Sequence, residues 1–253
     1  MIEQQNTIVV IPARLAAKRL PGKPLADIWG EPMIVHVWRR AVEAKIGHVL
    51  VAAGDLAIAE AIKKAGGDAI MTEANLPSGS DRVAAALRLR DPLARYSHVV
   101  NLQGDLPTIG SLSAQRCLAG LTNDSVDIST IAAEIHDAAD VANPNVVKAI
   151  APLSSNVGKD REVAFARDFV RQVTEEHKPP YWHHIGIYAY KREALDRFVA
   201  LPPSLREKER GLEQMRALDN GMKIAVVRVD TVPLGVDTPA DLEAARIALK
   251  EQR

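Results

Sequence analysis

The 253-residue chain has little cysteine, few aromatic residues and no excess charge of either sign. Its single cysteine, Cys117, excludes an internal disulfide and a cysteine-rich metal cluster. Only 4% of the residues are aromatic, which argues against the stacking platforms that bind single-stranded nucleic acid. Lysine plus arginine equals aspartate plus glutamate, 32 each, so no overall field attracts nucleic acid or an anionic membrane.

Long apolar runs and targeting signals are missing as well. No run approaches the roughly 18 apolar residues that a bilayer-spanning helix needs. The first residues, MIEQQNT, lack the basic and apolar regions of a signal peptide. We therefore expect a cytoplasmic protein with neither a membrane nor a nucleic acid as partner.

Two common phosphate-binding motifs are absent. The chain has no G-x-x-x-x-G-K-[ST] loop, and no G-x-G-x-x-G follows its first apolar strand, so neither a P-loop hydrolase nor a dinucleotide-binding dehydrogenase is supported. That strand runs instead into a loop that carries Arg14, Lys18, Arg19, Gly22 and Lys23. Four cations beside a glycine are typical of a polyphosphate site. The alternative is a proline-shaped turn whose cations are merely solvated.

Apolar periodicity predicts an α/β fold. In the first half, strands expected at 7–11, 49–53, 69–71 and 97–102 alternate with helices expected at 33–44, 56–65, 78–90 and 111–121. Uninterrupted apolar strands separated by amphipathic helices indicate a sheet buried on both faces. We expect a Rossmann-like, mostly parallel sheet flanked by helices.

The second half has a different pattern. Short strands are expected at 128–133, 146–151, 162–166 and 182–190, with loops at 151–160 and 172–180. Helices expected at 192–199, at 205–220 and from Pro239 flank a last strand at 224–229. We predict one domain over 1–253 with an antiparallel or mixed-sheet insertion at about 127–190.

Two aspartates stand where a phosphate site needs a metal ion. Asp105 follows the strand expected at 97–102, at the end where open parallel sheets place ligands. Asp237 precedes the last helix. Because Mg²⁺ is commonly held by one or two carboxylates plus phosphate oxygens, the pair predicts a magnesium site. The alternatives are a turn residue at Asp105 and a helix cap at Asp237.

The run from Arg14 to Leu25, RLAAKRLPGKPL, resembles the signature loop of sugar nucleotidyltransferases. It is most similar to that of the cytidylyltransferases that activate 3-deoxy-manno-octulosonate (Kdo), whose R-x-x-S-x-R-L-P-G-K-P-L has a serine in place of Ala17. Further segments match that family in the same order: SGSDR at 78–82, QGDLP at 103–107, NPN at 143–145, FAR at 165–167, HIGIY at 184–188, LEQMR at 212–216 and GVDTPADL at 235–242. Within them, Leu106 and Ala166 replace the family's usual Glu and Ser.

This resemblance implies a magnesium-dependent transfer of CMP from CTP to the anomeric hydroxyl of Kdo. Pyrophosphate is released, and a homodimer supplies CMP-Kdo for lipopolysaccharide synthesis. The catalytic residues implied are Arg14, Arg19, Lys23, Asp105 and Asp237, of which the two aspartates hold the metal. Those implied for the nucleotide are Pro12, Ala13, Arg14, Arg19, Lys23, Ser80, Gln103 and Asp105. Alternatives are a cytidylyltransferase for amino-Kdo or a sialic acid, and a non-catalytic nucleotide-binding regulatory homologue.

The acidic sugar implies a second set of residues. Arginine pairs bidentately with a carboxylate, which favours Arg82 and Arg167, although both are in residue patterns that also suit surface arginines. His183 and His184, adjacent on a strand, point to opposite faces and cannot chelate one metal together, so His184 is assigned to sugar hydroxyls. The predicted sugar-binding residues are Arg82, Gln103, Arg167, His184, Tyr188 and Glu213; for Glu213 a solvated helix position is the alternative.

Overall fold

The computed structural model describes residues 2–16, 19–155 and 162–250. Ala17 and Lys18 of the predicted phosphate loop lie outside the described residues. The chain divides into two compact units: unit 1 is Met1–Gln115 with Pro233–Arg253, and unit 2 is Arg116–Val232. The predicted insertion at about 127–190 stays a prediction. Across the described ranges, no helix combines the length and apolar character that crossing a bilayer requires.

Unit 1 contains a parallel sheet with strand order β5-β4-β1-β6. Its strands are β1 (Thr7–Ala13), β4 (His48–Ala53), β5 (Asp68–Met71) and β6 (His98–Leu102). Its helices are α1 (Met33–Glu43), α2 (Leu56–Lys64), α3 (Gly79–Arg90) and α9 (Pro239–Lys250), and α4 (Ser111–Ala119) runs into unit 2. Smaller elements are η1 (Gln4–Asn6), η2 (Lys23–Leu25), β2 (Asp27–Ile28) and β3 (Glu31–Pro32).

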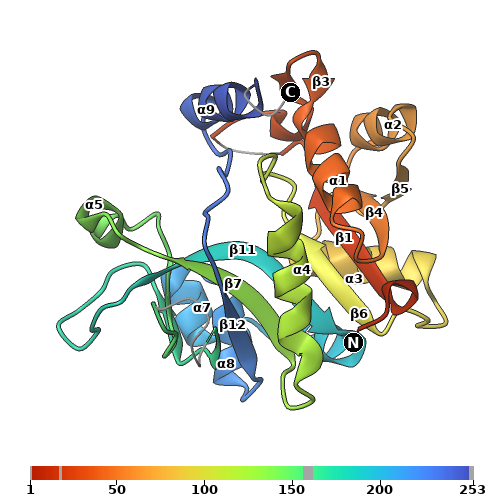
Figure 1. The fold of residues 1–253 in the computed structure, drawn as a ribbon. Helices are drawn as coiled ribbons and strands as arrows, with labels where there is room; N and C mark the ends of the chain where they lie inside the picture. Colours follow the sequence, from red (N-terminus) through yellow and green to blue (C-terminus); the bar gives the residue numbers. More distant parts are fainter. Residues whose placement is uncertain (1, 17–18, 156–161, 251–253) are drawn as a thin grey trace. The chain divides into compact units, whose positions relative to one another are not determined.

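Helices cover the sheet of unit 1, as Figure 1 shows for α1, α2 and α3. Helices α1 and α2 contact each other and β4, and α3 contacts β1, β4, β5 and β6. Between β5 and β6 the chain crosses over β4 and β1, in the direction opposite to the earlier connections of this sheet. Because such crossovers are right-handed, α3 lies on the face of the sheet opposite α1 and α2. Every residue of β1 is buried, which confirms the predicted parallel sheet with two covered faces.

The C-terminal helix α9 packs beside the small β2–β3 sheet (Figure 1). A buried apolar cluster joins them, formed by Ile28, Met33, Val236, Leu242, Ala245 and Leu249. The indole of Trp29 donates to the Arg246 carbonyl at 2.8 Å, and the amide of Val236 donates to the Asp105 carbonyl at 2.9 Å. These contacts hold the residues before α9 against the turn that follows β6.

Unit 2 contains a mixed sheet with strand order β11-β7-β12-β9, in which β8 pairs with β11 and β10 with β8. Its strands are β7 (Ile128–Glu134), β8 (Lys148–Ile150), β9 (Val163–Phe165), β10 (Asp168–Val170), β11 (Trp182–Lys191) and β12 (Ile224–Val229). Its helices are η3 (Gly120–Thr122), α5 (Ala138–Ala142), α6 (Arg192–Ala200), α7 (Leu205–Arg210) and α8 (Gln214–Asp219). Strand β7 runs antiparallel to β11 and parallel to β12, which agrees with the predicted mixed sheet.

One predicted element of unit 2 is wrong. The helix expected at 205–220 is two helices, because Gly211 adopts the left-handed conformation (φ 61°, ψ 43°) that ends α7. The short strand β10 and the short helix α5 were not expected from the sequence. The loops expected at 151–160 and 172–180 contain no helix or strand at the positions that the structure describes.

Candidate active site

A pocket of about 240 Å³ lies in unit 1 at the carboxyl ends of β1 and β6. This is the edge where a parallel sheet is expected to bind ligands. The predicted site residues that line it are Pro12, Ala13, Arg14, Lys23, Arg82, Gln103 and Asp105. The pocket is also lined by Ala16, Pro24, Leu76, Ser78, Gly79 and Gly104. Sequence analysis gave none of these a role, although all but Leu76 lie in the segments that it matched.

Asp105 and Asp237 converge on one cation. The Nζ atom of Lys23 lies 2.9 Å from Oδ2 of Asp105 and 3.1 Å from Oδ1 of Asp237. Burial lowers the pKa of Lys23, but the two aspartates offset this, and the pKa is raised overall. Arg19 pairs with the other oxygen of Asp237 at 2.9 Å. The structure therefore brings together four of the five residues predicted to be catalytic, and the fifth, Arg14, lines the same pocket.

The side chain of Asp237 does not cap helix α9, which was the alternative role for this residue. Helix α9 is capped by its neighbours: Oδ2 of Asp241 accepts from the Thr238 amide at 2.8 Å and from the Asp237 amide at 3.0 Å. Asp241 in turn donates its amide to the Thr238 hydroxyl at 3.2 Å. Burial would raise the pKa of Asp241, but these hydrogen bonds lower it overall. The carboxylate of Asp237 thus contacts cations instead of the helix terminus.

The two carboxylates fit a magnesium ion. One oxygen of each lies within hydrogen-bond distance of the same ammonium nitrogen, so both point at one position. Among the described residues, no group of three or more histidine, cysteine, aspartate or glutamate side chains is placed to hold a metal. Two carboxylates, with the remaining ligands from phosphate and water, are the donor set that Mg²⁺ commonly takes.

Two glycines shape the chain around this pair. Gly22 adopts a positive φ of 72°, which favours glycine, and this turn leads directly into Lys23. A Cβ on Gly104 would lie 3.0 Å from the carbonyl oxygen of Pro12, so a side chain would crowd the backbone where the end of β6 approaches β1. Leu106, at the position where the resembling family usually has a glutamate, is buried, and its hydrocarbon side chain has no oxygen that could bind a metal.

The amino terminus of α3 also borders the pocket, a feature that sequence analysis missed. Ser78 caps the helix by accepting the Asp81 amide at 3.1 Å, and both Ser78 and Gly79 line the pocket. A helix amino terminus attracts anions through its free amides and its dipole. The S-x-x-D pattern was the available signal. Ser80, predicted to bind the nucleotide, is 2% exposed and is not among the lining residues.

Arg82 is not a surface arginine, since it is 2% exposed. Its guanidinium donates to the Thr72 hydroxyl at 2.6 Å and to the carbonyls of Glu73 and Ala74 at 2.9 and 3.0 Å. Its pKa is lowered by burial and by nearby Arg14. Arg82 therefore holds the segment after β5 against the pocket, and its role toward a sugar carboxylate stays a prediction.

Gln103 is oriented by the sheet below it. Its amide nitrogen donates to the side-chain oxygen of Asn101 at 3.1 Å, and Asn101 is almost fully buried in β6. The Asn101 contact fixes the orientation of the Gln103 amide. Gln103 and Arg82 are the members of the predicted sugar-binding set that belong to unit 1.

The other predicted sugar-binding residues belong to unit 2. His184 and Tyr188 lie on β11 with ring centroids 5.5 Å apart, and Tyr188 and Glu213 border the same small recess. Arg167, between β9 and β10, is exposed, and Ala166 beside it is bonded through its amide to the Ile224 carbonyl at 2.8 Å. The structure thus brings His184, Tyr188 and Glu213 together, while Arg167 has the exposure of a surface arginine.

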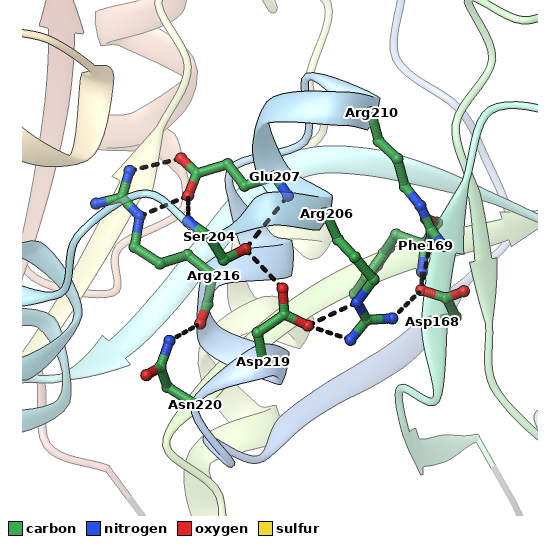
Figure 2. A network of polar contacts seen from close by, with 9 residues as sticks. All are labelled: Asp168, Phe169, Ser204, Arg206, Glu207, Arg210, Arg216, Asp219 and Asn220. Atoms are coloured by element: carbon green, nitrogen blue, oxygen red, sulfur yellow. Dashed lines mark hydrogen bonds and ion pairs between the residues drawn. The ribbon is translucent and has the colours of Figure 1, made fainter.

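Figure 2 shows a polar network that joins α7 and α8. Glu213 lies between these two helices in the sequence. Arg216 forms two hydrogen bonds to Glu207, at 2.6 and 2.8 Å, and both side chains are largely buried. Arg210 pairs with Asp168 at 2.7 Å (Figure 2). Sequence analysis missed this network, although the capping box formed by Ser204 and Glu207 has the S-x-x-E spacing that marks a helix start.

The chain matches the cytidylyltransferase family over residues 8–224. A 3-deoxy-manno-octulosonate cytidylyltransferase from Paramagnetospirillum magneticum is 51% identical over 96% of this chain and 97% of its own length. The protein of the same name from Methylobacterium radiotolerans is 54% identical over 98% of both chains.

Solved structures agree with these relatives. A CMP:2-keto-3-deoxy-manno-octonic acid synthetase in complex with CTP matches with a TM-score of 0.87 and 35% identity, over 98% of this chain and 100% of that chain. A 4-diphosphocytidyl-2C-methyl-D-erythritol synthase from Anaerococcus prevotii has a TM-score of 0.62 at 11% identity, over 98% of this chain and 100% of its own, a likeness of fold alone. The predicted nucleotidyltransferase type of α/β fold is confirmed.

Proposed function

Since the chain belongs to the 3-deoxy-manno-octulosonate cytidylyltransferases, we propose that it transfers CMP from CTP to the anomeric hydroxyl of Kdo. The relative solved with CTP supports the nucleotide, and the names of the relatives support the sugar. The observation in this chain that carries the proposal is the convergence of Lys23, Asp105 and Asp237 at the edge of one pocket.

In the proposed reaction, the anomeric oxygen of the sugar forms a bond to the α-phosphorus of CTP. The bond from that phosphorus to the oxygen bridging to the β-phosphate breaks, pyrophosphate leaves, and the hydroxyl proton is lost. Negative charge builds up on the leaving pyrophosphate, so fixed cations at the pocket lower the barrier. Arg14, Arg19 and Lys23 are assigned to this role, and the amino terminus of α3 adds its dipole.

We assign the magnesium site to Asp105 and Asp237. When bound, Mg²⁺ neutralises phosphate oxygens and polarises the reacting phosphoryl group. The ammonium of Lys23 contacts the same carboxylates, so the metal and this lysine compete for them. Release of Lys23 from the aspartates would leave its charge available to the triphosphate.

Within unit 2, the sugar acid is assigned to Arg167, His184, Tyr188 and Glu213; the roles of Arg82 and Gln103 of unit 1 toward the sugar stay predictions from the sequence. Tyr188 and Glu213 offer a hydroxyl and a carboxylate at one recess, a donor and an acceptor suited to sugar hydroxyls. The exposed guanidinium of Arg167 is a candidate partner for the sugar carboxylate.

A coupled pyrophosphate assay tests the proposed function. CTP, Mg²⁺ and the protein are combined with Kdo, amino-Kdo or a sialic acid, and pyrophosphate is measured. We expect release with Kdo at a higher kcat/KM than with the other acids. A preference for another acid would change the assigned substrate, and CTP binding without pyrophosphate from any acceptor would favour the non-catalytic alternative.

The homodimer, the cytoplasmic location and the role in lipopolysaccharide synthesis also remain proposals. For the homodimer, β9 offers an edge: in the described part of unit 2 it pairs only with β12, and its Val163 and Phe165 side chains are exposed. Light scattering of the purified protein tests it, with a mass of twice 27.5 kDa expected. A mass that stays at one chain would contradict the dimer.

A further inference from the structure

The buried hydroxyl of Thr130 meets an irregularity in β11. The pairing of β11 with β7 shifts its register between Ile185 and Tyr188, so that Tyr188 lies opposite Thr130. The Oγ1 atom of Thr130 lies 2.7 Å from the Ile187 carbonyl oxygen and 3.0 Å from Nε2 of His184. Thr130 is fully buried and His184 is 8% exposed, so these contacts are formed away from bulk water.

Counting protons at Thr130 fixes the protonation of His184. A hydroxyl has one proton to donate, and a carbonyl oxygen has none. The proton therefore goes to the Ile187 carbonyl, which is the shortest contact; otherwise two oxygens would face each other at 2.7 Å with no proton between them. The hydroxyl oxygen then accepts from His184, so the ring proton is on Nε2 and Nδ1 carries a lone pair.

The rest of the surroundings hold this imidazole in one orientation. Phe169 on β10 contacts the imidazole edge-on, with ring centroids 4.9 Å apart. The ring of Tyr188, on the same strand as His184, has its centroid 5.5 Å from that of the imidazole. Burial lowers the pKa of His184 to about 3, which agrees with a neutral ring. No hydrogen bond joins Nδ1 to another described residue, so its lone pair is left to accept one.

We propose that Thr130 is a positioning residue that fixes His184 as the Nε2-protonated tautomer, so that Nδ1 accepts a hydrogen bond from a hydroxyl of the sugar acid. The proposal rests on the function proposed above. The proposal fixes the direction of the hydrogen bond at Nδ1. An unprotonated Nδ1 accepts a proton from a hydroxyl or an ammonium group and cannot donate one to a carbonyl or carboxylate oxygen. A site built to pair with a substrate hydroxyl discriminates strongly against an analogue that lacks it.

The substitutions Thr130→Val and Thr130→Ser test this role as a matched pair. Valine keeps the shape and removes the hydroxyl, whereas serine keeps the hydroxyl. Two-dimensional ¹⁵N NMR of protein labelled at histidine reports the tautomer of His184 directly. We expect the Nε2-protonated form in the wild type and in Thr130→Ser, and a mixture of tautomers or the Nδ1-protonated form in Thr130→Val.

Kinetics give the second readout. In Thr130→Val we expect KM for the sugar acid to rise about 10-fold, the cost of one hydrogen bond to a buried group, with KM for CTP changed by less than about twofold. Thr130→Ser should restore the wild-type KM for the sugar. A purely structural loss would instead lower the amount of active protein and leave both KM values unchanged.

An Nδ1-protonated His184 in the wild type would overturn the proposal, and so would an unchanged sugar KM in Thr130→Val. If Thr130→Val does not fold, the tautomer of His184 in the wild type still decides. Absence of CMP transfer to any sugar acid would overturn the proposed function. If the enzyme is active but His184 is protonated on Nδ1, only the proposed role of Thr130 is overturned.

Discussion

The ammonium of Lys23 lies 2.9 Å from a carboxylate oxygen of Asp105, with 15% and 33% of the two side chains exposed. The same nitrogen reaches Asp237, which enters the site from the segment before the last helix. One lysine thus bridges two carboxylates that come from distant parts of the sequence of unit 1. A magnesium ion held by the two aspartates, as proposed, would compete with Lys23 for the same carboxylate oxygens.

Replacing Asp237 separates metal binding from helix capping. We expect Asp237→Asn to keep the fold, because Thr238 and Asp241 form the cap. Its magnesium-dependent pyrophosphate release should fall about 10²–10³-fold, the usual cost of removing one group that stabilises a transition state. Steady-state kinetics measure the rate, and thermal melting followed by circular dichroism measures the fold.

The matched control for Asp237→Asn is Asp241→Asn. Loss of a cap destabilises a protein by about 1 kcal/mol, so this variant should melt earlier while its folded fraction turns over normally. Near-normal turnover of Asp237→Asn would refute the metal assignment.

Removing the competing ammonium should change metal binding in the absence of nucleotide. We expect Lys23→Met to bind Mg²⁺ about 10-fold more tightly than the wild type, because a positive charge at contact distance opposes a second cation in the same place. Isothermal titration calorimetry measures this affinity. Affinity for CTP should fall in the same variant. Lys64→Met, at an exposed position of α2, is the control, and an unchanged Mg²⁺ affinity in Lys23→Met would show that lysine and metal do not share the site.

The depressed pKa of His184 makes stability depend on pH. The unfolded chain protonates this histidine near pH 6.5, whereas the folded protein does so only near pH 3. As the pH falls below 6.5, the unfolded state therefore gains the proton first, and stability is lost progressively down to about pH 3. Between pH 7 and pH 5 this loss amounts to about 2 kcal/mol.

Urea unfolding followed by tryptophan fluorescence measures this loss in the wild type and in His184→Gln. The wild type should lose about 2 kcal/mol more than the variant between pH 7 and pH 5. Equal losses in the two proteins would mean that His184 titrates at its ordinary pH in the folded state.

The pair of Arg216 and Glu207 should be important for both stability and sugar binding. We expect Arg216→Met to destabilise the protein by about 3 kcal/mol, since Glu207 would stay buried without its partner. KM for the sugar acid should rise, because Glu213 lies in the short segment between α7, which carries Glu207, and α8, which carries Arg216. Arg206→Met removes a more exposed arginine of the same network and should cost less than about 1 kcal/mol. Equal losses in the two variants would contradict the importance of the buried pair.

The parallel sheet and the acid pair were predictable because each depends on a local rule. Continuous apolar strands between amphipathic helices identify the sheet, and ligands gather at the carboxyl ends of its strands, which singled out Asp105. The role of Asp237 was ambiguous, because an aspartate before a helix is common for capping alone. Only the hydrogen bonds of Asp241 show that the cap is made without it.

Other features depend on tertiary contacts that a sequence does not display. The carbonyls that engage Arg82 come from the segment after β5, and nothing in the pattern SGSDR marks its arginine as buried. Gly211 was ambiguous between a tolerated helix glycine and a helix end. Thr130 had no recognisable motif, because its importance comes from the register shift of the neighbouring strand.

The proposed reaction joins the α-phosphorus of CTP to a sugar acid. Incubation with Mg²⁺, Kdo and CTP radiolabelled at the α-phosphate tests it most directly, with the products separated by chromatography. We predict that the label moves into a CMP-sugar in an amount equal to the pyrophosphate formed, and that none moves when Kdo is omitted. Label that remains in CTP, or that appears in free CMP whether or not Kdo is present, would contradict the account.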